Sequence, residues 1–182
     1  MQATPEHSST TESEDWPRRL YDHLKEAGIQ QMSFVPDAGH SRLIDLFGAD
    51  PQVRSVTLTT EEEGIAVAAG AWLGGQRSVM LLQSSGVGNC INMLSLAANC
   101  RFPLLMMVTM RGEWAEFNPW QVPMGRATEA SLKLMGVHTI RVDEQDDIDD
   151  AMTSATTLAF DGDMMVAVIL SQRLLGRKKW IK

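Results

Sequence analysis

Short apolar segments alternate with helix-like segments from Trp16 onward, and this alternation most constrains the fold. The first helical pattern runs through Leu20 and Leu24 and stops at Gly28, and an apolar strand follows at 32–35. Further strands are expected at 55–58, 78–83, 104–110, 139–142 and 164–170. Further helices are expected at 40–47, 61–73, 88–99, 129–135 and 146–158. Such a pattern predicts an α/β fold: a single three-layer domain whose mostly parallel sheet of about six strands carries helices on both faces.

Composition limits the classes of function. The chain has 182 residues, 44% hydrophobic and 21% charged, which suits one domain with a sizeable core. Its net charge of −7 argues against a nucleic-acid surface, which needs basic residues to neutralise phosphates. Cys90 and Cys100 fall within one predicted helix and its end, so we expect neither a disulfide framework nor a metal site. No apolar run has membrane-spanning length and the N-terminus is polar, so a cytoplasmic protein is expected.

Three segments differ in character along the chain. Residues 1–14 lack large apolar groups beyond the first methionine and are expected to form a disordered tail, whereas 15–172 are expected to form the folded domain. Residues 173–182 are basic, which favours a solvated tail, with docking onto an acidic partner as the alternative. The stretch 111–128 is expected to be irregular, and loops of that length are usually functional or form interfaces.

A cluster of carboxylates stands at the start of an almost purely small and apolar helix. Thr60 and Glu63 have the spacing of a capping box, and acidic residues in a first helical turn are favoured by the helix dipole. Capping alone does not explain the small residues at 66–70, which suit close approach by another element. A carboxyl group beside such a surface is a candidate acid or base, so both interpretations stay open.

Polar loops follow several predicted strands. In a parallel sheet such loops meet beyond the carboxyl ends of the strands, where ligands bind. The four loops are residues 36–40, the carboxylate cluster that begins at Glu61, residues 83–89, and residues 111–113. Residues 84–89 suit either a tight strand-to-helix turn or a turn where a ligand approaches backbone N–H groups. A dinucleotide fingerprint is weak, because Gly86 and Gly88 are not followed by a third glycine.

Four motifs in order carry a family resemblance: EEEGIAVAAG at 61–70, QSSGVGN at 83–89, RGE at 111–113 and QVPMGRAT at 121–128. Together they resemble the pyrimidine-binding (PYR) domain of thiamine diphosphate-dependent 2-oxo acid decarboxylases. Within that family, the resemblance is greatest to the α subunits of sulfopyruvate decarboxylases and next to phosphonopyruvate decarboxylases. It covers roughly residues 16–170, nearly the whole predicted domain.

The resemblance implies roles for individual residues. A family glutamate stands nine positions before the last glycine of its helix, and counting back from Gly70 gives Glu61. This leaves Glu63 as a cap and Glu62 exposed or at a subunit contact. A carboxyl group bonded to the cofactor's pyrimidine nitrogen shifts that ring toward its imino form, which removes the thiazolium proton. The implied cofactor-binding residues are Glu61, Gln83, Ser84, Ser85, Gly86 and Asn89. The implied substrate-binding residues are Asp37, Gly39, His40, Arg111 and Arg126.

Two of these assignments have ordinary alternatives. A histidine just inside a helix start, such as His40, is often only a surface residue. Arg111 and Arg126 suit a sulfonate or phosphonate, and equally suit bridges to carboxylates within the loop.

The family's second domain has no counterpart in this sequence. That domain holds the diphosphate through a metal, with a Gly-Asp-Gly motif and a later asparagine, and the Asp-Gly-Asp at 161–163 is not that motif. The resemblance therefore implies a separate β subunit that binds the diphosphate and magnesium, with thiamine diphosphate shared between subunits. Self-association and an anionic 2-oxo acid substrate are also expected, with 3-sulfopyruvate first and phosphonopyruvate as the alternative.

Two other classes remain open. The chain is alternatively a non-catalytic PYR-like scaffold or regulatory subunit, which would tolerate loss of Glu61. A nicotinamide or flavin Rossmann protein would bind its nucleotide as an isolated chain.

Overall fold

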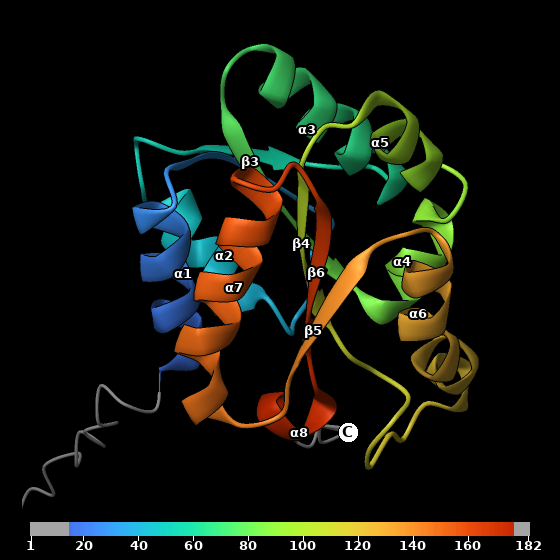
Figure 1. Cartoon of the computed structure of the whole chain (residues 1–182). Coiled ribbons are helices and arrows are strands. Elements are labelled where there is room, and N and C mark those ends of the chain that lie inside the picture. Colours follow the sequence, from blue (N-terminus) through green and yellow to red (C-terminus); the bar gives the residue numbers. More distant parts are fainter. Residues whose placement is uncertain (1–14, 177–182) are drawn as a thin grey trace, which may run out of the picture.

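A six-stranded sheet with helices on both faces forms the centre of the computed structural model, which describes residues 15–176 (Figure 1). The tails expected at 1–14 and, from residue 177 on, at the C-terminus lie outside the described residues. The strands are β1 (Ile29–Phe34), β2 (Arg54–Thr57), β3 (Arg77–Gln83), β4 (Leu104–Thr109), β5 (His138–Val142) and β6 (Met165–Leu170). The α-helices are α1 (Trp16–Glu26), α2 (Ser41–Gly48), α3 (Glu62–Leu73), α4 (Ser84–Cys90), α5 (Leu94–Cys100), α6 (Val122–Leu134), α7 (Ile148–Phe160) and α8 (Gln172–Leu175). Short 3-10 turns are η2 (Pro119–Gln121) and η3 (Gln145–Asp147).

The strand order is β2-β1-β3-β4-β6-β5, and every neighbouring pair is parallel. Leu81 of β3 is in register with Met107 of β4, which is in register with Val168 of β6. The predicted α/β class with a parallel sheet is confirmed. All carboxyl ends of the strands consequently lie at one edge.

Helices α1, α2 and α7 cover one face of the sheet, and α3 to α6 cover the other (Figure 1). Leu20, Leu24 and Phe47 are fully buried in the first of these layers. Ile65 and Leu132 are fully buried in the second. The alternation of short strands and helices therefore produces two apolar cores, one on each side of the sheet.

The bounds predicted for a helix at 88–99 are wrong. Helix α4 begins at Ser84, directly after the extended residue Gln83, and a turn at 91–93 separates it from α5. The glycines at 86 and 88 suggested a turn, but neither has positive φ, so both continue the helix. The strand therefore passes straight into a helix where the sequence suggested a loop.

The irregular stretch expected at 111–128 is shorter than predicted. Helix α6 begins at Val122 rather than at Glu129. Proline interrupts a helix when it stands in the interior. Pro123 stands in the first turn of α6, where it is tolerated because its missing N–H would have had no intrahelical partner. Helix α8 likewise includes Arg173, the first residue of the expected basic tail.

The loop after β4 packs backbone to backbone on the start of α6. Gly112 has φ +79°, and a Cβ there would lie 2.2 Å from the carbonyl oxygen of Gln121. A Cβ on Gly125 would lie 2.3 Å from the carbonyl oxygen of Arg111. Only glycine fits at these two positions, because the atoms that a Cβ would meet belong to the backbone and cannot rotate away as the end of a side chain can.

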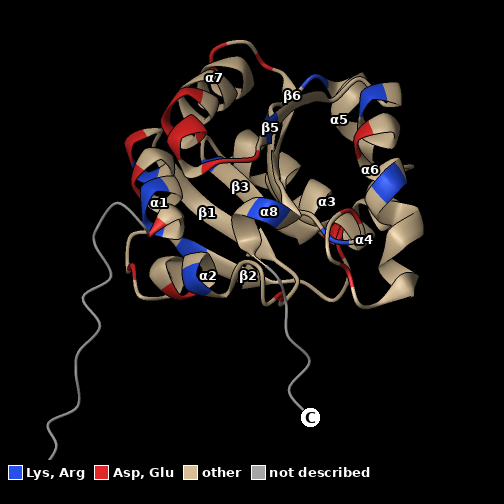
Figure 2. Ribbon diagram, turned by 90° about the horizontal axis from the view of Figure 1, so that it is seen from below, with Lys and Arg blue, Asp and Glu red and all other residues tan. Residues whose placement is uncertain are grey.

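Charged residues are unevenly distributed. They gather on α1, α2, α6 and α7, whereas α4 and α5 and most of α3 are almost free of them (Figure 2). Arg77 is the one charged residue between Gly64 and Cys100. Within residues 15–176, no helix has the length and apolar character needed to span a membrane.

We expect Gly125→Ala to lower the free energy of unfolding by about 1–3 kcal/mol, because the added methyl group must displace the backbone of Arg111. Gly48→Ala is the matched control: Gly48 lies at the end of α2 with nothing within 4 Å of an added Cβ, so this change should not destabilise the chain and should gain up to about 1 kcal/mol. Urea unfolding of both variants measures the difference. Equal stability of the two variants would contradict the close packing.

Candidate active site

The candidate site lies where the strand order changes direction. The chain passes from β1 outward to β2 and then returns to place β3 on the other side of β1. Ligands of open parallel sheets bind beyond the carboxyl ends of the strands at such a point. The ends of β1 and β3 meet there, where the Nε2 of Gln83 donates a 2.9 Å hydrogen bond to Asp37 Oδ1. The structure therefore brings these two predicted residues together.

Glu61 stands immediately before α3, and its side chain packs on the backbone of α4. A Cβ on Gly86 would lie 2.5 Å from the carboxyl carbon of Glu61, so only glycine leaves room. The Nδ2 of Asn89 donates a 2.8 Å hydrogen bond to Glu61 Oε2. Among residues 15–176, none donates a hydrogen bond to the other oxygen, Oε1. The carboxyl group is thus fixed at one oxygen and available at the other.

The neighbouring carboxylates serve the helix start. Glu63 Oε2 accepts a 2.9 Å hydrogen bond from the backbone N–H of Thr59. The Thr60 hydroxyl donates to Glu62 instead of capping α3. The reciprocal capping box expected from Thr60 and Glu63 is therefore wrong in its partners, although Glu63 does satisfy a free N–H at this turn. Glu62 is engaged locally and is only partly exposed.

The serines that follow β3 connect the loops to one another. Ser84 is fully buried, and its Oγ accepts a 3.1 Å hydrogen bond from the backbone N–H of Arg111. Its carbonyl oxygen accepts a 3.3 Å bond from the hydroxyl of Thr128. Ser85 donates a 2.9 Å bond to Gln83 Oε1. Ser84 therefore acts as internal support, whereas Ser85 orients the amide of Gln83.

His40 lies in the interior, where only 1% of it is exposed. Its Nε2 lies 3.0 Å from the carbonyl oxygen of Met107 and 3.3 Å from that of Leu82, so this nitrogen carries the proton. Burial lowers the pKa of His40 and keeps the imidazole neutral. Nδ1 has no partner among the described residues. This placement corrects the alternative of a surface residue, since His40 is buried and supports the loop that carries Gly39 and Asp37. Its contact with substrate stays a prediction.

Arg111 is engaged by the loop that follows it. Its Nε and a terminal guanidinium nitrogen each lie 2.6 Å from a carboxylate oxygen of Glu116, and its guanidinium carbon lies 5.5 Å from the ring centre of Phe117. The bonds from Arg111 hold the pKa of the Glu116 carboxyl at about 2. Arg111 therefore bridges a carboxylate within the loop, which was the alternative to substrate binding. Arg126, on α6, is exposed and has no ion-pair partner in the described part of the chain.

Gln172 is a buried residue that sequence reasoning missed. Its Oε1 accepts from the backbone N–H groups of Glu113 and Trp114 at 3.2 and 3.0 Å, and its Nε2 donates to Glu116 Oε2 at 3.0 Å. One amide thus ties the loop after β4 to the turn after β6. No sequence signal marks it, because its partners lie far away along the chain.

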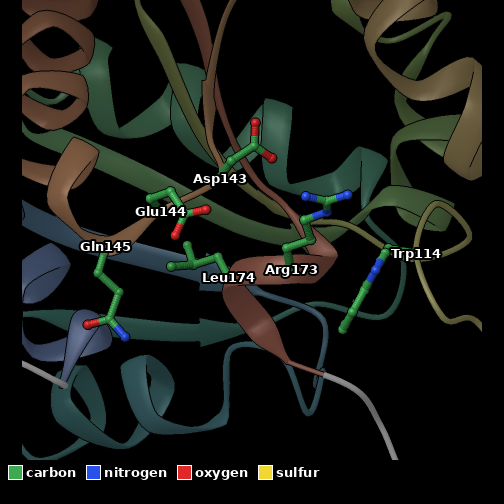
Figure 3. Close-up of a pocket in the computed structure, with 6 residues that line it drawn as sticks. All are labelled: Trp114, Asp143, Glu144, Gln145, Arg173 and Leu174. Atoms are coloured by element: carbon green, nitrogen blue, oxygen red, sulfur yellow. The ribbon is translucent and has the colours of Figure 1, made fainter.

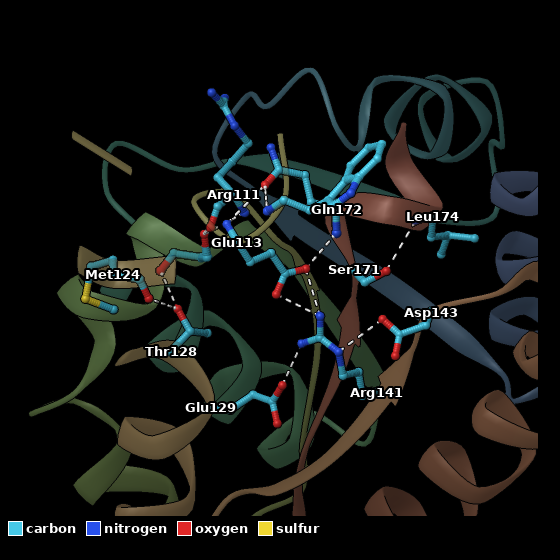
Figure 4. Close-up of polar contacts among 12 residues, drawn as sticks. Arg111, Glu113, Met124, Thr128, Glu129, Arg141, Asp143, Ser171, Gln172 and Leu174 are labelled. Atoms are coloured by element: carbon cyan, nitrogen blue, oxygen red, sulfur yellow. Dashed lines mark hydrogen bonds and ion pairs between the residues drawn. The ribbon is translucent and has the colours of Figure 1, made fainter. Parts of the chain in front are cut away.

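Arg141 is the centre of a second network (Figure 4). Its guanidinium bonds both oxygens of Glu113 at 2.8 and 2.7 Å, Glu129 at 2.7 Å and Asp143 at 3.2 Å. These contacts join β5, α6 and the loop after β4. The loop is therefore tied to β5 by the Glu113–Arg141 pair, in addition to the Arg111–Glu116 pair within it.

An open cavity of about 480 Å³ lies at the ends of β5 and β6. Arg173 and Asp143 extend into the same space, with Trp114 at its rim (Figure 3). Its other lining residues are Glu144, Gln145 and Leu174. None of the predicted site residues lines it, and the strand order separates it from Glu61. In the region covered by residues 15–176, no cluster of three His, Cys, Asp or Glu side chains is arranged to hold a metal ion.

We expect Glu116→Gln to lower the free energy of unfolding by about 3 kcal/mol at neutral pH, because Arg111 loses its buried partner. The pKa of Glu116 is depressed in the folded chain, so its contribution is present above the unfolded pKa of about 4.3 and is lost as the pH falls toward about 2. Urea unfolding across this range should show the difference from wild type shrinking below about pH 4.5.

Glu26→Gln, which changes an exposed carboxylate at the end of α1, is the control and should alter stability by less than about 0.5 kcal/mol. A Glu116→Gln deficit that stays constant down to about pH 3 would mean that the ion pair does not determine it.

Comparison with known proteins identifies relatives of this chain. It is 40% identical over 124 residues to "Sulfopyruvate decarboxylase subunit alpha" of Methanothermobacter thermautotrophicus, an alignment that covers 68% of this chain and 75% of the relative. It is also 40% identical over 109 residues to "Phosphonopyruvate decarboxylase" of Streptomyces viridochromogenes, covering 59% of this chain and 28% of that longer protein.

A solved structure shares the fold. The 2-oxoglutarate:ferredoxin oxidoreductase of Magnetococcus marinus superposes with a TM-score of 0.73 at 17% identity, over 90% of this chain and 31% of the other. At that identity the likeness shows the fold alone. The sequence matches the family described as "Thiamine pyrophosphate enzyme, N-terminal TPP binding domain" over residues 17–119, which is more than half of the chain. Together with the α-subunit relative, this match shows that the chain belongs to the thiamine pyrophosphate enzyme family, as its N-terminal TPP-binding domain.

Proposed function

We propose that this chain is the pyrimidine-binding subunit of a two-subunit thiamine diphosphate-dependent decarboxylase. Its substrate is 3-sulfopyruvate, which yields sulfoacetaldehyde and carbon dioxide, and phosphonopyruvate is the alternative. The observation that carries the proposal is the Glu61 carboxyl group, fixed against Gly86 and by Asn89 with one oxygen available. The similarity to a sulfopyruvate decarboxylase α subunit supports the choice of substrate.

The residues present fit the pyrimidine end of thiamine diphosphate. Gly86 leaves a backbone surface without a side chain beside Glu61, and Oε1 of that glutamate is a free acceptor among the described residues. When bound, the cofactor would supply carbanion chemistry for decarboxylation of the 2-oxo acid. Glu61 would hold the pyrimidine ring by sharing a proton with one of its nitrogens, and Asn89 keeps the Glu61 carboxyl group oriented. Gln83 and Ser85 lie at the adjoining strand end and complete this wall.

The substrate side of the site is assigned to the loop after β1 and to α6. Asp37 lies beside Gln83 at the sheet edge, and Gly39 packs beside Asp37 and Thr109. Arg126 is the exposed cation that we assign to the distal sulfonate or phosphonate, since a guanidinium forms charge-assisted bonds to such groups. Arg111 is left out of this role, because Glu116 occupies its guanidinium.

A partner subunit is proposed to bind the diphosphate and magnesium. Support comes from the relative's designation as a subunit and from the near absence of charged residues on α4, α5 and most of α3 (Figure 2). Trp120, which is 84% exposed, and Phe117 add aromatic side chains to the loop after β4. Aromatic and uncharged surfaces of this kind are typical of interface cores, and self-association is proposed on the same ground.

The isolated chain should bind thiamine diphosphate weakly and should be inactive, because the diphosphate and magnesium ligands are assigned to the partner. Calorimetry with cofactor and magnesium should show little heat for this chain alone. The assembled enzyme should decarboxylate sulfopyruvate faster than phosphonopyruvate or pyruvate in a coupled assay. Tight magnesium-dependent binding to the isolated chain would contradict the two-subunit arrangement, and a preference for phosphonopyruvate would select the alternative substrate.

Glu61→Gln should leave assembly intact but slow proton exchange at cofactor C2 by about 100-fold or more, because an amide cannot share the proton. Glu63→Gln is the matched control: it removes the bond to Thr59 and should cost about 0.5–2 kcal/mol of stability without slowing exchange. Exchange measured by NMR in the assembled enzyme separates the two. If neither variant slows exchange, the chain is a non-catalytic scaffold.

A further inference from the structure

Asp37 belongs to a loop without regular structure, yet its side chain is fixed at both oxygens. The loop leaves β1 and reaches α2 through a bend, so its backbone alone does not set the direction of the carboxylate. Gln83 Nε2 donates to Oδ1 at 2.9 Å and Thr109 Oγ1 donates to Oδ2 at 2.7 Å. These donors come from β3 and β4, which adjoin in the sheet. The carboxylate is thus oriented by two strands other than its own.

The main hydrogen bond of the Thr109 side chain is the one that it donates to Asp37. It is the last residue of β4 and is 1% exposed, so water does not compete for its hydroxyl. A hydroxyl has a single proton to donate. Its second possible acceptor, the carbonyl oxygen of Leu82, is 3.5 Å away, compared with 2.7 Å for Asp37. The proton therefore goes to the carboxylate.

The loop also packs directly on this pair. A Cβ on Gly39 would lie 2.8 Å from Asp37 Oδ2 and 3.0 Å from the methyl carbon of Thr109. Gly39 was expected to contact substrate, but its lack of a side chain has this structural reason. The closeness leaves the carboxylate little room to rotate while the Thr109 bond is in place.

Two nearby ionisable groups make their hydrogen bonds elsewhere. His40 is neutral because burial lowers its pKa, and its Nε2 is taken by backbone carbonyls. Arg111 is paired with Glu116. Hydrogen bonds to a charged acceptor are roughly twice as strong as neutral ones, so the Thr109 bond is a substantial part of what holds Asp37.

We infer that Thr109 is a positioning residue, which fixes the Asp37 carboxylate at the substrate side of the site. The inference rests on the proposed function, because it assumes that Asp37 faces the reacting substrate. A carboxylate repels an anionic substrate and cannot help to bind it. Loss of its orientation should therefore reduce turnover rather than affinity.

Thr109→Val removes the hydroxyl and keeps the shape of the side chain. In the assembled enzyme it should lower kcat at least about tenfold while KM changes less than about threefold. Thr109→Ser, which keeps the hydroxyl, should recover kcat to within about threefold of wild type. In an Asp37→Asn background, Thr109→Val should cost less than about threefold, because the group that it positions is already changed.

Thr156→Val is the matched control: it removes a hydroxyl bonded within α7 and should leave kcat unchanged. If Thr109→Val disturbs β4, Thr109→Ala takes its place, because it also lacks the hydroxyl that Thr109→Ser keeps. Equal loss in the wild-type and Asp37→Asn backgrounds, or no recovery with serine, would assign Thr109 to the fold alone.

Crystal structures of the full-length variants give a readout that does not depend on activity. The Asp37 carboxylate should leave its wild-type position in Thr109→Val and keep it in Thr109→Ser; an unmoved carboxylate in Thr109→Val overturns the inference. If the assembled wild-type enzyme decarboxylates none of the 2-oxo acids, the proposed function fails, and the crystal structures still decide the role of Thr109.

Discussion

The contact between the Glu61 carboxyl group and the backbone of Gly86 ties the candidate site to the fold. It requires α4 to begin directly at the end of β3, so that a helix backbone and not a loop faces Glu61. It also requires α3 to begin just after Glu61, and Glu63 secures that start by accepting the N–H of Thr59. Both helix starts lie at one edge because all strands are parallel. The position of one carboxyl group therefore depends on the order of the whole sheet.

The ionisable groups discussed at the site are neutral or have a hydrogen-bond or ion-pair partner, with Arg126 as the exception. Glu116 occupies Arg111, burial keeps His40 neutral, and neutral donors hold Asp37. A desolvated charge without a partner is costly, which explains this pattern near a buried sheet edge. Of the cations considered for the substrate, Arg126 alone lacks an ion-pair partner among the described residues. Arg126 is therefore the predicted substrate-binding cation that the described residues leave available to an anion.

Sequence reasoning reached the fold class, because it follows from a local pattern, whereas the choice of Glu61 came from the family resemblance and its role stays a prediction. Alternating strands and helices predict a parallel sheet, and polar loops after strands predict its functional edge. The contacts of Gln172 and Arg141 were not predictable, since they join segments that only the folded chain brings together. The start of α4 was missed for a local reason: Gly86 and Gly88 suggest a turn, and only the contact with Glu61 explains a glycine inside that helix.

The distribution of charge suits an acidic protein that acts on an anion. The net charge is −7, and part of this charge lies on α1, α2 and α7, on the face of the sheet opposite to α3 and α4, whereas Glu62 and Glu63 stand in the first turn of α3 (Figure 2). Exposed charges are screened by salt over about 10 Å at 0.1 M, so carboxylates on the far face act weakly on a ligand at the sheet edge. Short-range pairs at the site are screened far less. The few groups that meet the substrate, and not the overall charge of the chain, therefore decide which anion is accepted.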